Sequence, residues 1–235
     1  MISVCMATYN GEKYIKEQID SILPQLADGD ELVVSDDGSS DNTCDIVRAY
    51  GDTRIKLFFN NGYHGYVGNF ENALHHAHGD YIFLCDQDDV WHPGKVEVVM
   101  RNLQKYDLVT HNAELVDENG VSMGKTYFDC THKRIGFFSN LLETRHLGCC
   151  MAFNRKVLND ALPFVSRKRG HDYWIGCVAE LKYKVKFIDD VLIFYRRHRN
   201  NASSCSSNSK NSFKAKFLKR LDMAYSLFLR FILKR

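Results

Sequence analysis

Tyr81-Ile82-Phe83-Leu84-Cys85-Asp86-Gln87-Asp88-Asp89 is the stretch that decides the fold. Its first five residues are a short apolar run, which predicts a buried strand, and the Pro93-Gly94 pair beyond it indicates a loop. Three carboxylates therefore crowd the end of a core strand, where like charges repel unless a cation or a proton intervenes. A divalent ion that prefers oxygen ligands, Mg²⁺ or Mn²⁺, suits such a site. The alternative is a solvated acidic turn.

Strands and helices alternate along the first half of the chain. Apolar runs and helical periodicity predict strands at 2–7, 31–35, 55–59 and 81–85 and helices near 12–23, 41–50 and 67–78. Such alternation is typical of parallel βαβ units with right-handed crossovers. We therefore expect an α/β fold with a mixed, mostly parallel sheet flanked by helices.

Polar clusters follow the first, second and fourth of these strands, at the sheet edge where ligands bind in parallel sheets. Asp36 and Asp37 end the second strand. An ionised carboxylate only accepts hydrogen bonds, so it suits the N3–H group of a uracil or thymine ring. Tyr9, on the neighbouring loop, is expected to stack on that ring. The alternative for this stretch is a helix cap supplied by Ser40 or Asp41.

Neither a G-x-G-x-x-G fingerprint nor a Walker A loop follows these strands. A nucleotide bound at this edge would therefore be held through a metal ion and not through a glycine-rich cradle.

The second half of the chain is less regular. It predicts a strand at 108–112, a helix at 172–182 and two strands at 185–188 and 191–196, while residues 114–150 show no clear pattern. Residues 202–212 are rich in Ser and Asn and indicate a linker between residues 1–201 and a C-terminal helix.

Two polar groups of this half are candidates for chemistry. Asp172 opens the late helix, where it is either a helix N-cap or a general base. Arg196, Arg197 and His198 follow the last strand, and guanidinium groups match the oxygens of a pyrophosphate. His198 also offers an imidazole nitrogen to a metal. The alternative is a basic edge strand that is protected against pairing.

Composition and charge narrow the class of protein. With 235 residues, 45% hydrophobic and 26% charged, the chain suits one large globular α/β domain with an extension. The formal net charge is +2, and because residues 212–235 hold seven Lys/Arg and one Asp, the rest of the chain carries −4. An acidic body without a basic face argues against nucleic acid as a partner.

Cysteine usage and the N-terminus bear on the compartment. None of the eight cysteines stands in a C-x-x-C pair, so a zinc ribbon or a thioredoxin-type site is not expected. The chain opens on a strand without a basic region ahead of an apolar stretch, and no run of 18 apolar residues occurs. We expect a cytoplasmic protein with reduced thiols.

The tail, residues 213–235, predicts a basic amphipathic helix. Its apolar residues include Phe213, Phe217, Leu221, Ala224 and Phe228, and lysines and arginines fill other faces. A helix of this kind is expected to lie on an anionic membrane surface, which would make the protein peripheral at the inner face of the plasma membrane. The alternatives are packing on its own domain or on a second subunit.

The order of these motifs resembles glycosyltransferase family 2. The resemblance is carried by Ala7-Thr8-Tyr9-Asn10, Ser35-Asp36-Asp37-Gly38-Ser39, Asp86-Gln87-Asp88-Asp89-Val90-Trp91, His171-Asp172-Tyr173-Trp174 and Tyr195-Arg196-Arg197-His198. It spans residues 1–201, and the Asp-Gln-Asp-Asp-Val-Trp form is most similar to bacterial rhamnosyltransferase-like members. The family implies a GT-A fold, a nucleotide-diphosphate-sugar donor, Mn²⁺ or Mg²⁺, and inversion at the anomeric carbon.

The resemblance also implies roles for individual residues. Ala7, Tyr9, Asp36, Asp37 and Asp86 would bind the nucleotide. Asp88 and His198 would bind the metal, Arg196, Arg197 and His198 would bind the phosphates, and Asp172 would be the catalytic base. The chain departs from the family at Gly68-Asn69, where many members carry an arginine-asparagine pair.

The expected reaction is transfer of a sugar to a hydroxyl of a saccharide or lipid-linked saccharide, as in bacterial surface polysaccharide synthesis. The alternatives are a non-catalytic nucleotide-sugar-binding subunit of a membrane-associated assembly and a phosphatase with an Asp-x-Asp nucleophile. A phosphatase would carry Thr or Ser after the second aspartate, where this chain has Asp89.

Overall fold

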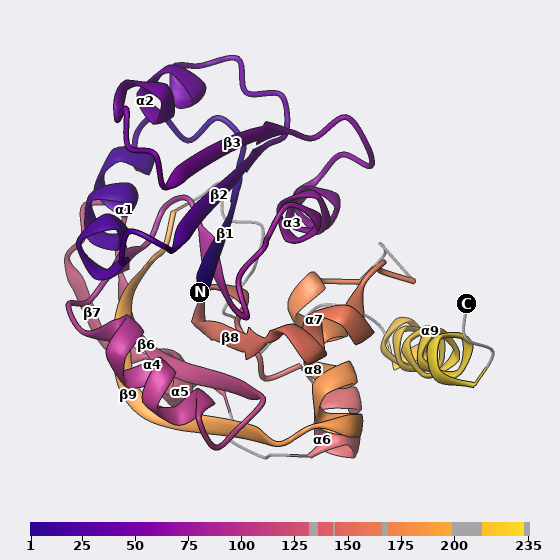
Figure 1. Cartoon of the computed structure of the whole chain (residues 1–235). Helices are drawn as coiled ribbons and strands as arrows, with labels where there is room; N and C mark the ends of the chain where they lie inside the picture. The colour runs from indigo at the N-terminus through magenta and orange to yellow at the C-terminus, as the bar shows by residue number, and fades with distance from the viewer. Residues whose placement is uncertain (132–135, 143, 166–168, 199–212, 233–235) are drawn as a thin grey trace.

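The computed structural model describes residues 1–131, 136–142, 144–165, 169–198 and 213–232 (Figure 1). The described strands form one mixed sheet in the order β3-β2-β1-β4-β8-β6-β9-β5, and β7 pairs with β6. The expected α/β architecture is confirmed, with helices on both faces of a curled sheet.

The first half of the chain folds as its periodicity predicts. Strands β1 to β4 run parallel to one another, and a helix follows each of the first three. These elements are β1 (Ile2–Thr8), α1 (Ile15–Ile22), β2 (Glu31–Asp36), α2 (Thr43–Ala49), β3 (Ile55–Phe59), α3 (Tyr66–His75) and β4 (Tyr81–Asp86). A short 3-10 helix, Leu23–Gln25, extends α1 through Pro24.

The second half corrects several expectations. The two strands expected at 185–188 and 191–196 are one strand. The described part of residues 114–150 contains the end of β6, strand β7, two short α-helices and a 3-10 helix. The elements are β5 (Val90–Trp91), α4 (Lys95–Leu103), β6 (Leu108–Val116), β7 (Ser122–Thr126), α5 (Tyr127–Cys130), α6 (Phe137–Leu142), η2 (Gly148–Cys150), β8 (Met151–Asn154), α7 (Arg155–Ala161), α8 (His171–Lys182), β9 (Val185–Arg196) and α9 (Phe213–Phe231).

Two apolar cores cover the two faces of the sheet. Residues of α1, α2, α4 and α5 pack on one face, and residues of α3, α7, α8 and α9 pack on the other. Alternate residues of β1 enter the two cores, Val4 and Met6 on one side and Cys5 on the other, as the two-residue period of a strand requires.

Strand register brings the carboxyl ends of β1, β2 and β4 to one edge. Ala7 pairs with Asp86, and Thr8 pairs with Asp36. On the far side of the sheet, β5 pairs with β9 through Val90 and Phe194. The acidic stretch that separates β4 from β5 is thereby held beside the end of β9.

The C-terminal helix forms as the sequence predicts, while the linker expected at 202–212 lies outside the described residues. In the described parts of the chain, every helix is too short or too polar to cross a membrane.

Candidate active site

Asp88 and His198 meet at the rim of the sheet, although 110 positions separate them in the chain. Nε2 of His198 lies 2.7 Å from Oδ2 of Asp88, and both side chains are nearly buried. The His198 ring stacks on Tyr14, with ring centroids 5.2 Å apart. The segment after β9 that carries His198 is thus joined to the acidic stretch, and the Asp88 carboxylate and the His198 imidazole lie side by side at the rim.

Arg196 fixes this arrangement from behind. Its main-chain nitrogen donates to Oδ1 of Asp89, and its Nε donates to the carbonyl of Asp88. Its two terminal nitrogens donate to the carbonyl of Glu118 and to the carboxylate of Glu17. Because each guanidinium nitrogen bonds a protein oxygen, the side chain holds the acidic stretch in place. Arg197 donates from Nη1 to the hydroxyl of Tyr195 over 3.2 Å.

A buried cluster lies beneath this rim. An oxygen of Asp86, an oxygen of Asp89 and Sγ of Cys149 lie within 4.8 Å of one another. Lys95 is buried beside them, donates from Nζ to the carbonyl of Cys149 over 3.0 Å, and lies 4.0 Å from the ring centroid of Trp91. Burial lowers the pKa of Lys95.

The carboxylates of this cluster resist ionisation. Burial, with the charges of Asp88 and Asp172, raises the pKa of Asp86 to about 7. Burial and the charges of Asp88 and Asp86 also raise the pKa of Asp89 well above its usual range. Oδ2 of Asp89 is buried and receives no hydrogen bond from any described residue. The crowded carboxylates of Asp86 and Asp89, together with Asp88 and the imidazole of His198 at the rim above them, fit a divalent cation such as Mn²⁺ or Mg²⁺.

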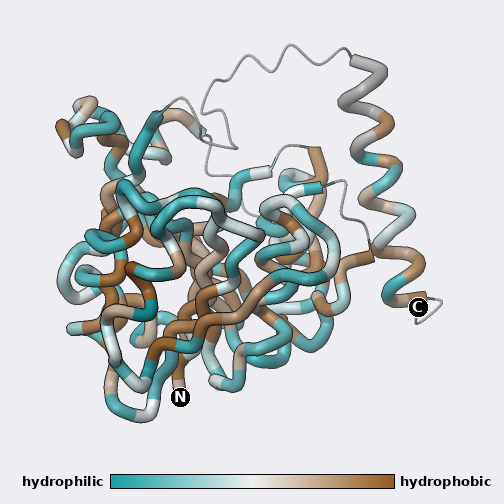
Figure 2. The backbone as a smooth tube through the Cα atoms, turned by 90° about the horizontal axis from the view of Figure 1, so that it is seen from above, coloured by the Kyte–Doolittle hydropathy of each residue, from teal (hydrophilic) through white to brown (hydrophobic). Residues whose placement is uncertain are grey.

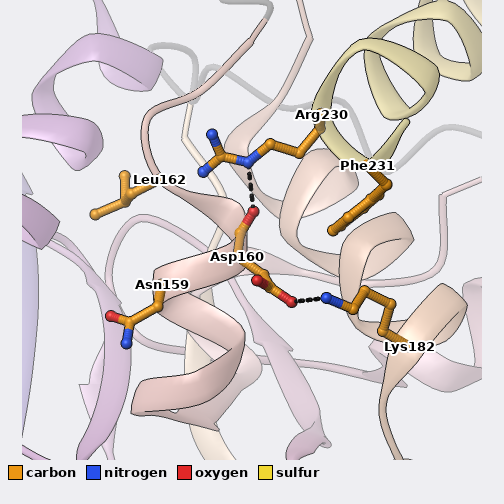
Figure 3. Close-up of a pocket in the computed structure, with 6 residues that line it drawn as sticks. All are labelled: Asn159, Asp160, Leu162, Lys182, Arg230 and Phe231. Carbon is orange, nitrogen blue, oxygen red and sulfur yellow. Dashed lines mark hydrogen bonds and ion pairs between the residues drawn. The ribbon is translucent and has the colours of Figure 1, made fainter. Parts of the chain in front are cut away.

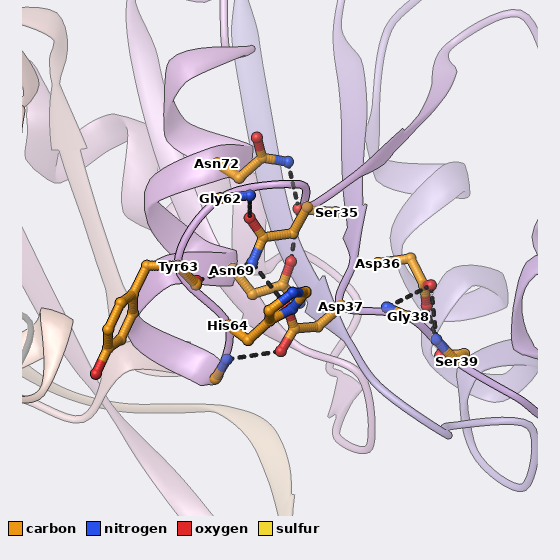
Figure 4. A network of polar contacts seen from close by, with 12 residues as sticks. Ser35, Asp36, Asp37, Gly38, Ser39, Gly62, Tyr63, His64, Asn69 and Asn72 are labelled. Carbon is orange, nitrogen blue, oxygen red and sulfur yellow. Dashed lines mark hydrogen bonds and ion pairs between the residues drawn. The ribbon is translucent and has the colours of Figure 1, made fainter.

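Asp37 is held by polar contacts with the loop that follows β3 (Figure 4). Its Oδ1 accepts from Nδ2 of Asn60 over 2.7 Å and lies 2.9 Å from Nδ1 of His64, and its Oδ2 accepts from the main-chain nitrogen of Gly65 over 2.7 Å. A carboxylate offers about four acceptor positions. The three bonds therefore fix the carboxylate and leave an acceptor position for a ligand.

Asp36 turns the other way and is almost fully buried. It accepts hydrogen bonds from the hydroxyl groups of Thr8 and Ser39 and from the main-chain nitrogens of Gly38 and Ser39. The carboxylate is saturated by protein donors, so Asp36 shapes the loop.

Gln87, in the middle of the acidic motif, joins the loop after β4 to the loop after β1. Its side-chain oxygen accepts from the main-chain nitrogen of Tyr9 over 2.9 Å, and its side-chain nitrogen donates to the Tyr9 carbonyl over 3.1 Å. The Tyr9 ring is exposed. The loops after β1 and β4 are therefore joined, and the predicted base-stacking residue is held next to the acidic rim.

Asp172 stands at the first turn of α8, where Oδ1 accepts from the main-chain nitrogen of Tyr173 over 2.7 Å. Its charge contributes to the raised pKa of Asp86 and of Tyr66, so the carboxylate lies within electrostatic range of both groups. The preceding His171 is buried and stacks on Phe70, with centroids 3.9 Å apart. These contacts fix the first turn of α8, which carries the Asp172 carboxylate.

Sequence reasoning missed several residues of this site. Asn60 and His64 carry no motif signal, and Gln87 lies within the acidic motif without a predicted role. The contacts of all three depend on loops that meet only in the fold. Lys95 could have been found, because Lys95, Val99 and Leu103 recur at helical spacing and all three are buried.

Solved structures share this fold at low sequence identity. Staphylococcus aureus TarS in complex with UDP-GlcNAc superposes with a TM-score of 0.73 and 20% identity, over 97% of this chain and 66% of that chain. The mannosyltransferase PcManGT from Pyrobaculum calidifontis, in complex with GDP-Man and Mn²⁺, gives 0.62 and 21%, over 98% of this chain and 64% of that chain. The fold is that of GT-A glycosyltransferases.

Sequence comparisons agree. An Escherichia coli protein, the UDP-Glc:alpha-D-GlcNAc-diphosphoundecaprenol beta-1,3-glucosyltransferase WfgD, is 33% identical over 212 residues, which cover 88% of this chain and 80% of that protein. An uncharacterized glycosyltransferase of Nostoc is 27% identical over 91% of this chain and 70% of that protein. The family model described as glycosyl transferase family 2 matches residues 3–162. The chain is therefore a glycosyltransferase and belongs to family 2.

Proposed function

We propose that this glycosyltransferase moves a sugar from a UDP-sugar donor to a hydroxyl of a lipid-linked saccharide, with inversion at the anomeric carbon. The observation that carries the proposal is the meeting of Asp88 and His198 at 2.7 Å at the rim. The charge of Asp172, on α8, reaches the neighbouring Asp86. Asp88 and His198 can hold the diphosphate of a donor through a metal ion, and Asp172 can activate the hydroxyl of an acceptor.

The nucleotide end of the donor is assigned to Asp37 and Tyr9. The fixed carboxylate of Asp37 would accept the N3–H of a pyrimidine base, and the exposed ring of Tyr9 would stack on it. Ala7 and Asp86, paired across β1 and β4, would border the ribose. WfgD is named for a UDP-Glc donor, which favours uracil. Rhamnose remains a prediction of the sequence alone.

The diphosphate end is assigned to Asp88, His198 and Arg197. Asp88 and His198 would hold Mn²⁺ or Mg²⁺, and such a cation, when bound, neutralises charge on the diphosphate leaving group. The guanidinium of Arg197 would contact the phosphate oxygens. Arg196 acts through the acidic stretch that it holds in place.

Asp172 is assigned as the general base. Its Oδ1 is oriented by the Tyr173 nitrogen, and its carboxylate would take the proton of the acceptor hydroxyl as that oxygen attacks the sugar. WfgD is named for a diphosphoundecaprenol-linked acceptor. An acceptor of that class would place this enzyme at a membrane, in the synthesis of surface polysaccharide.

The test separates donor binding from acceptor activation. Asp88→Asn is expected to abolish both transfer and the binding of UDP with Mn²⁺. Asp172→Asn is expected to lower transfer by about 10²–10⁴-fold, the usual contribution of a general base, with UDP binding unchanged. Asp45→Asn, on the exposed surface of α2, is the matched control. Calorimetry with UDP and Mn²⁺ and a transfer assay measure both effects, and equal loss of UDP binding in the two site variants would refute these roles.

A further inference from the structure

Helix α9 carries more apolar side chains than the domain beneath it covers. Met223 and Leu227 are buried against the core that also contains α7 and α8. Five other apolar side chains are between 48% and 65% exposed: Leu218, Leu221, Tyr225, Phe228 and Ile232. Their spacings of three, four, three and four residues place them in one stripe along the helix, here called the outer stripe.

Polar contacts fix the rotation of the helix that turns this stripe outward. Asp222 pairs with Arg169 over 3.1 Å. Arg220 donates to the carbonyl of Leu142 over 2.8 Å, and Arg230 donates to the carbonyl of Asp160 over 2.8 Å (Figure 3). The outer stripe is exposed because the opposite side of α9 is attached at several points.

The surface on which α9 packs is separate from the acidic rim. A pocket of about 450 Å³ lies there between α7, α8 and α9, and it is lined by Asn159, Asp160, Leu162, Lys182, Arg230 and Phe231. None of these residues belongs to the candidate active site. Seen from above, α9 runs along one side of the body, with apolar segments along its length (Figure 2).

The charge of this segment is strongly positive. Residues 213–235 hold seven Lys/Arg and one Asp, which gives +6. Asp222, the one acid, is already paired with Arg169 of the domain. Arg220 and Arg230 bond main-chain carbonyls and not carboxylates, so these contacts do not neutralise them. An exposed apolar stripe within a cationic helix is the pattern of a helix that binds anionic lipid.

We propose that the outer stripe docks on an anionic lipid surface. Phe138 and Leu142, on the adjacent helix α6, are also exposed apolar side chains. A second copy of this chain is a poorer occupant, because pairing through the stripe would bring together two C-terminal segments, residues 213–235, that each carry +6. A lipid surface supplies the opposite charge. The inference does not depend on the transfer reaction.

Co-sedimentation with vesicles tests the proposal. The wild-type protein is expected to pellet with vesicles that contain phosphatidylglycerol, to stay in solution with pure phosphatidylcholine, and to bind less at high salt. Leu221→Gln with Phe228→Gln, in the outer stripe, is expected to weaken binding at least tenfold. Val121→Gln with Met123→Gln, two exposed apolar residues at the β6–β7 hairpin, is the matched control and is expected to bind as the wild type does.

Three outcomes overturn the proposal. The first is a wild-type protein that does not pellet with anionic vesicles, and the second is a stripe variant that pellets equally well. The third is a wild-type dimer that the stripe variant loses in sedimentation velocity without lipid, because a second copy would then be the occupant. Circular dichroism and UDP binding check that the stripe variant is folded. Vesicle binding is read without donor or acceptor, so failure of the proposed reaction would leave this result unaffected.

Discussion

Gly68 shows how one residue shapes the loop around Asp37. A Cβ atom added at Gly68 would lie 1.7 Å from the carbonyl oxygen of Tyr63, in the loop that surrounds Asp37. An arginine at this position, as in many members of the family, therefore requires the loop to move away. In this chain the loop of residues 60–65 occupies the space that a side chain at position 68 would need. Glycine at position 68 therefore lets the same loop pack against α3 and bond Asp37.

Gly68→Ala is therefore expected to weaken binding of UDP and to destabilise the protein by about 1–3 kcal/mol, the usual cost of overpacking. The neighbouring Gly62 is the matched control, because its added Cβ would lie 3.5 Å from Oδ1 of Asn60, an ordinary contact. Urea unfolding and calorimetry with UDP measure the two effects. Similar values for Gly68→Ala and Gly62→Ala would show that the loop adapts without cost.

At the residue scale, the sequence predicts which carboxylates lie at the rim but not where each one points. Successive side chains of a strand face opposite sides. Asp36 therefore bonds its own loop, while Asp37 bonds the loop that follows β3. The partner of each carboxylate is visible only in the folded chain. The same limit applies to Arg196 and Arg197, since the carboxylate that engages Arg196 belongs to Glu17, in a distant part of the chain.

At the scale of elements, the two loops after β1 and β4 act as one unit through Gln87. Gln87→Ala removes both hydrogen bonds to the main chain of Tyr9. Solvent competes for exposed bonds of this kind, so the expected loss is about 1 kcal/mol, which is about a fivefold weaker affinity for UDP. Stability is expected to change little.

Gln104→Ala, at the end of α4, is the control for this substitution, because its side chain bonds only within its own helix, to the carbonyl of Met100. Titration calorimetry with UDP compares the two variants with the wild type. Unchanged UDP affinity in Gln87→Ala would mean that Tyr9 is held without the bridge.

The sequence predicts a helix or strand well where the segments that pack against it are close to it in the chain. Each βα unit of the first half carries its own periodicity, and all four strands were placed within two residues. Strand β5 has two residues and exists because Val90 and Trp91 pair with β9, about 100 positions away. The register of β9 on β6 shifts near Asn112. Such an irregularity follows from strand pairing and leaves little trace in a sequence.

At the scale of the whole molecule, burial of titratable groups links stability to pH. Burial, with the charges of Lys95 and His92, lowers the pKa of His111 well below its usual range. Below about pH 6.5, the usual pKa of histidine, the unfolded chain therefore binds a proton at this position that the folded chain does not. The contribution of His111 to stability is complete above that pH and is lost as the pH falls.

His111→Gln removes this linkage. As the pH falls from 7 to 5, the wild type is expected to lose stability relative to the variant, by up to about 1.4 kcal/mol for each pH unit below 6.5. Asp86 and Asp89, whose pKa values are raised, contribute the opposite slope in both proteins, so their effect cancels in the difference. His75→Gln, on the exposed surface of α3, is the matched control and is expected to follow the wild type. Urea unfolding at each pH gives the three curves, and a constant difference between wild type and His111→Gln would show that His111 takes up its proton in the folded state as readily as in the unfolded chain.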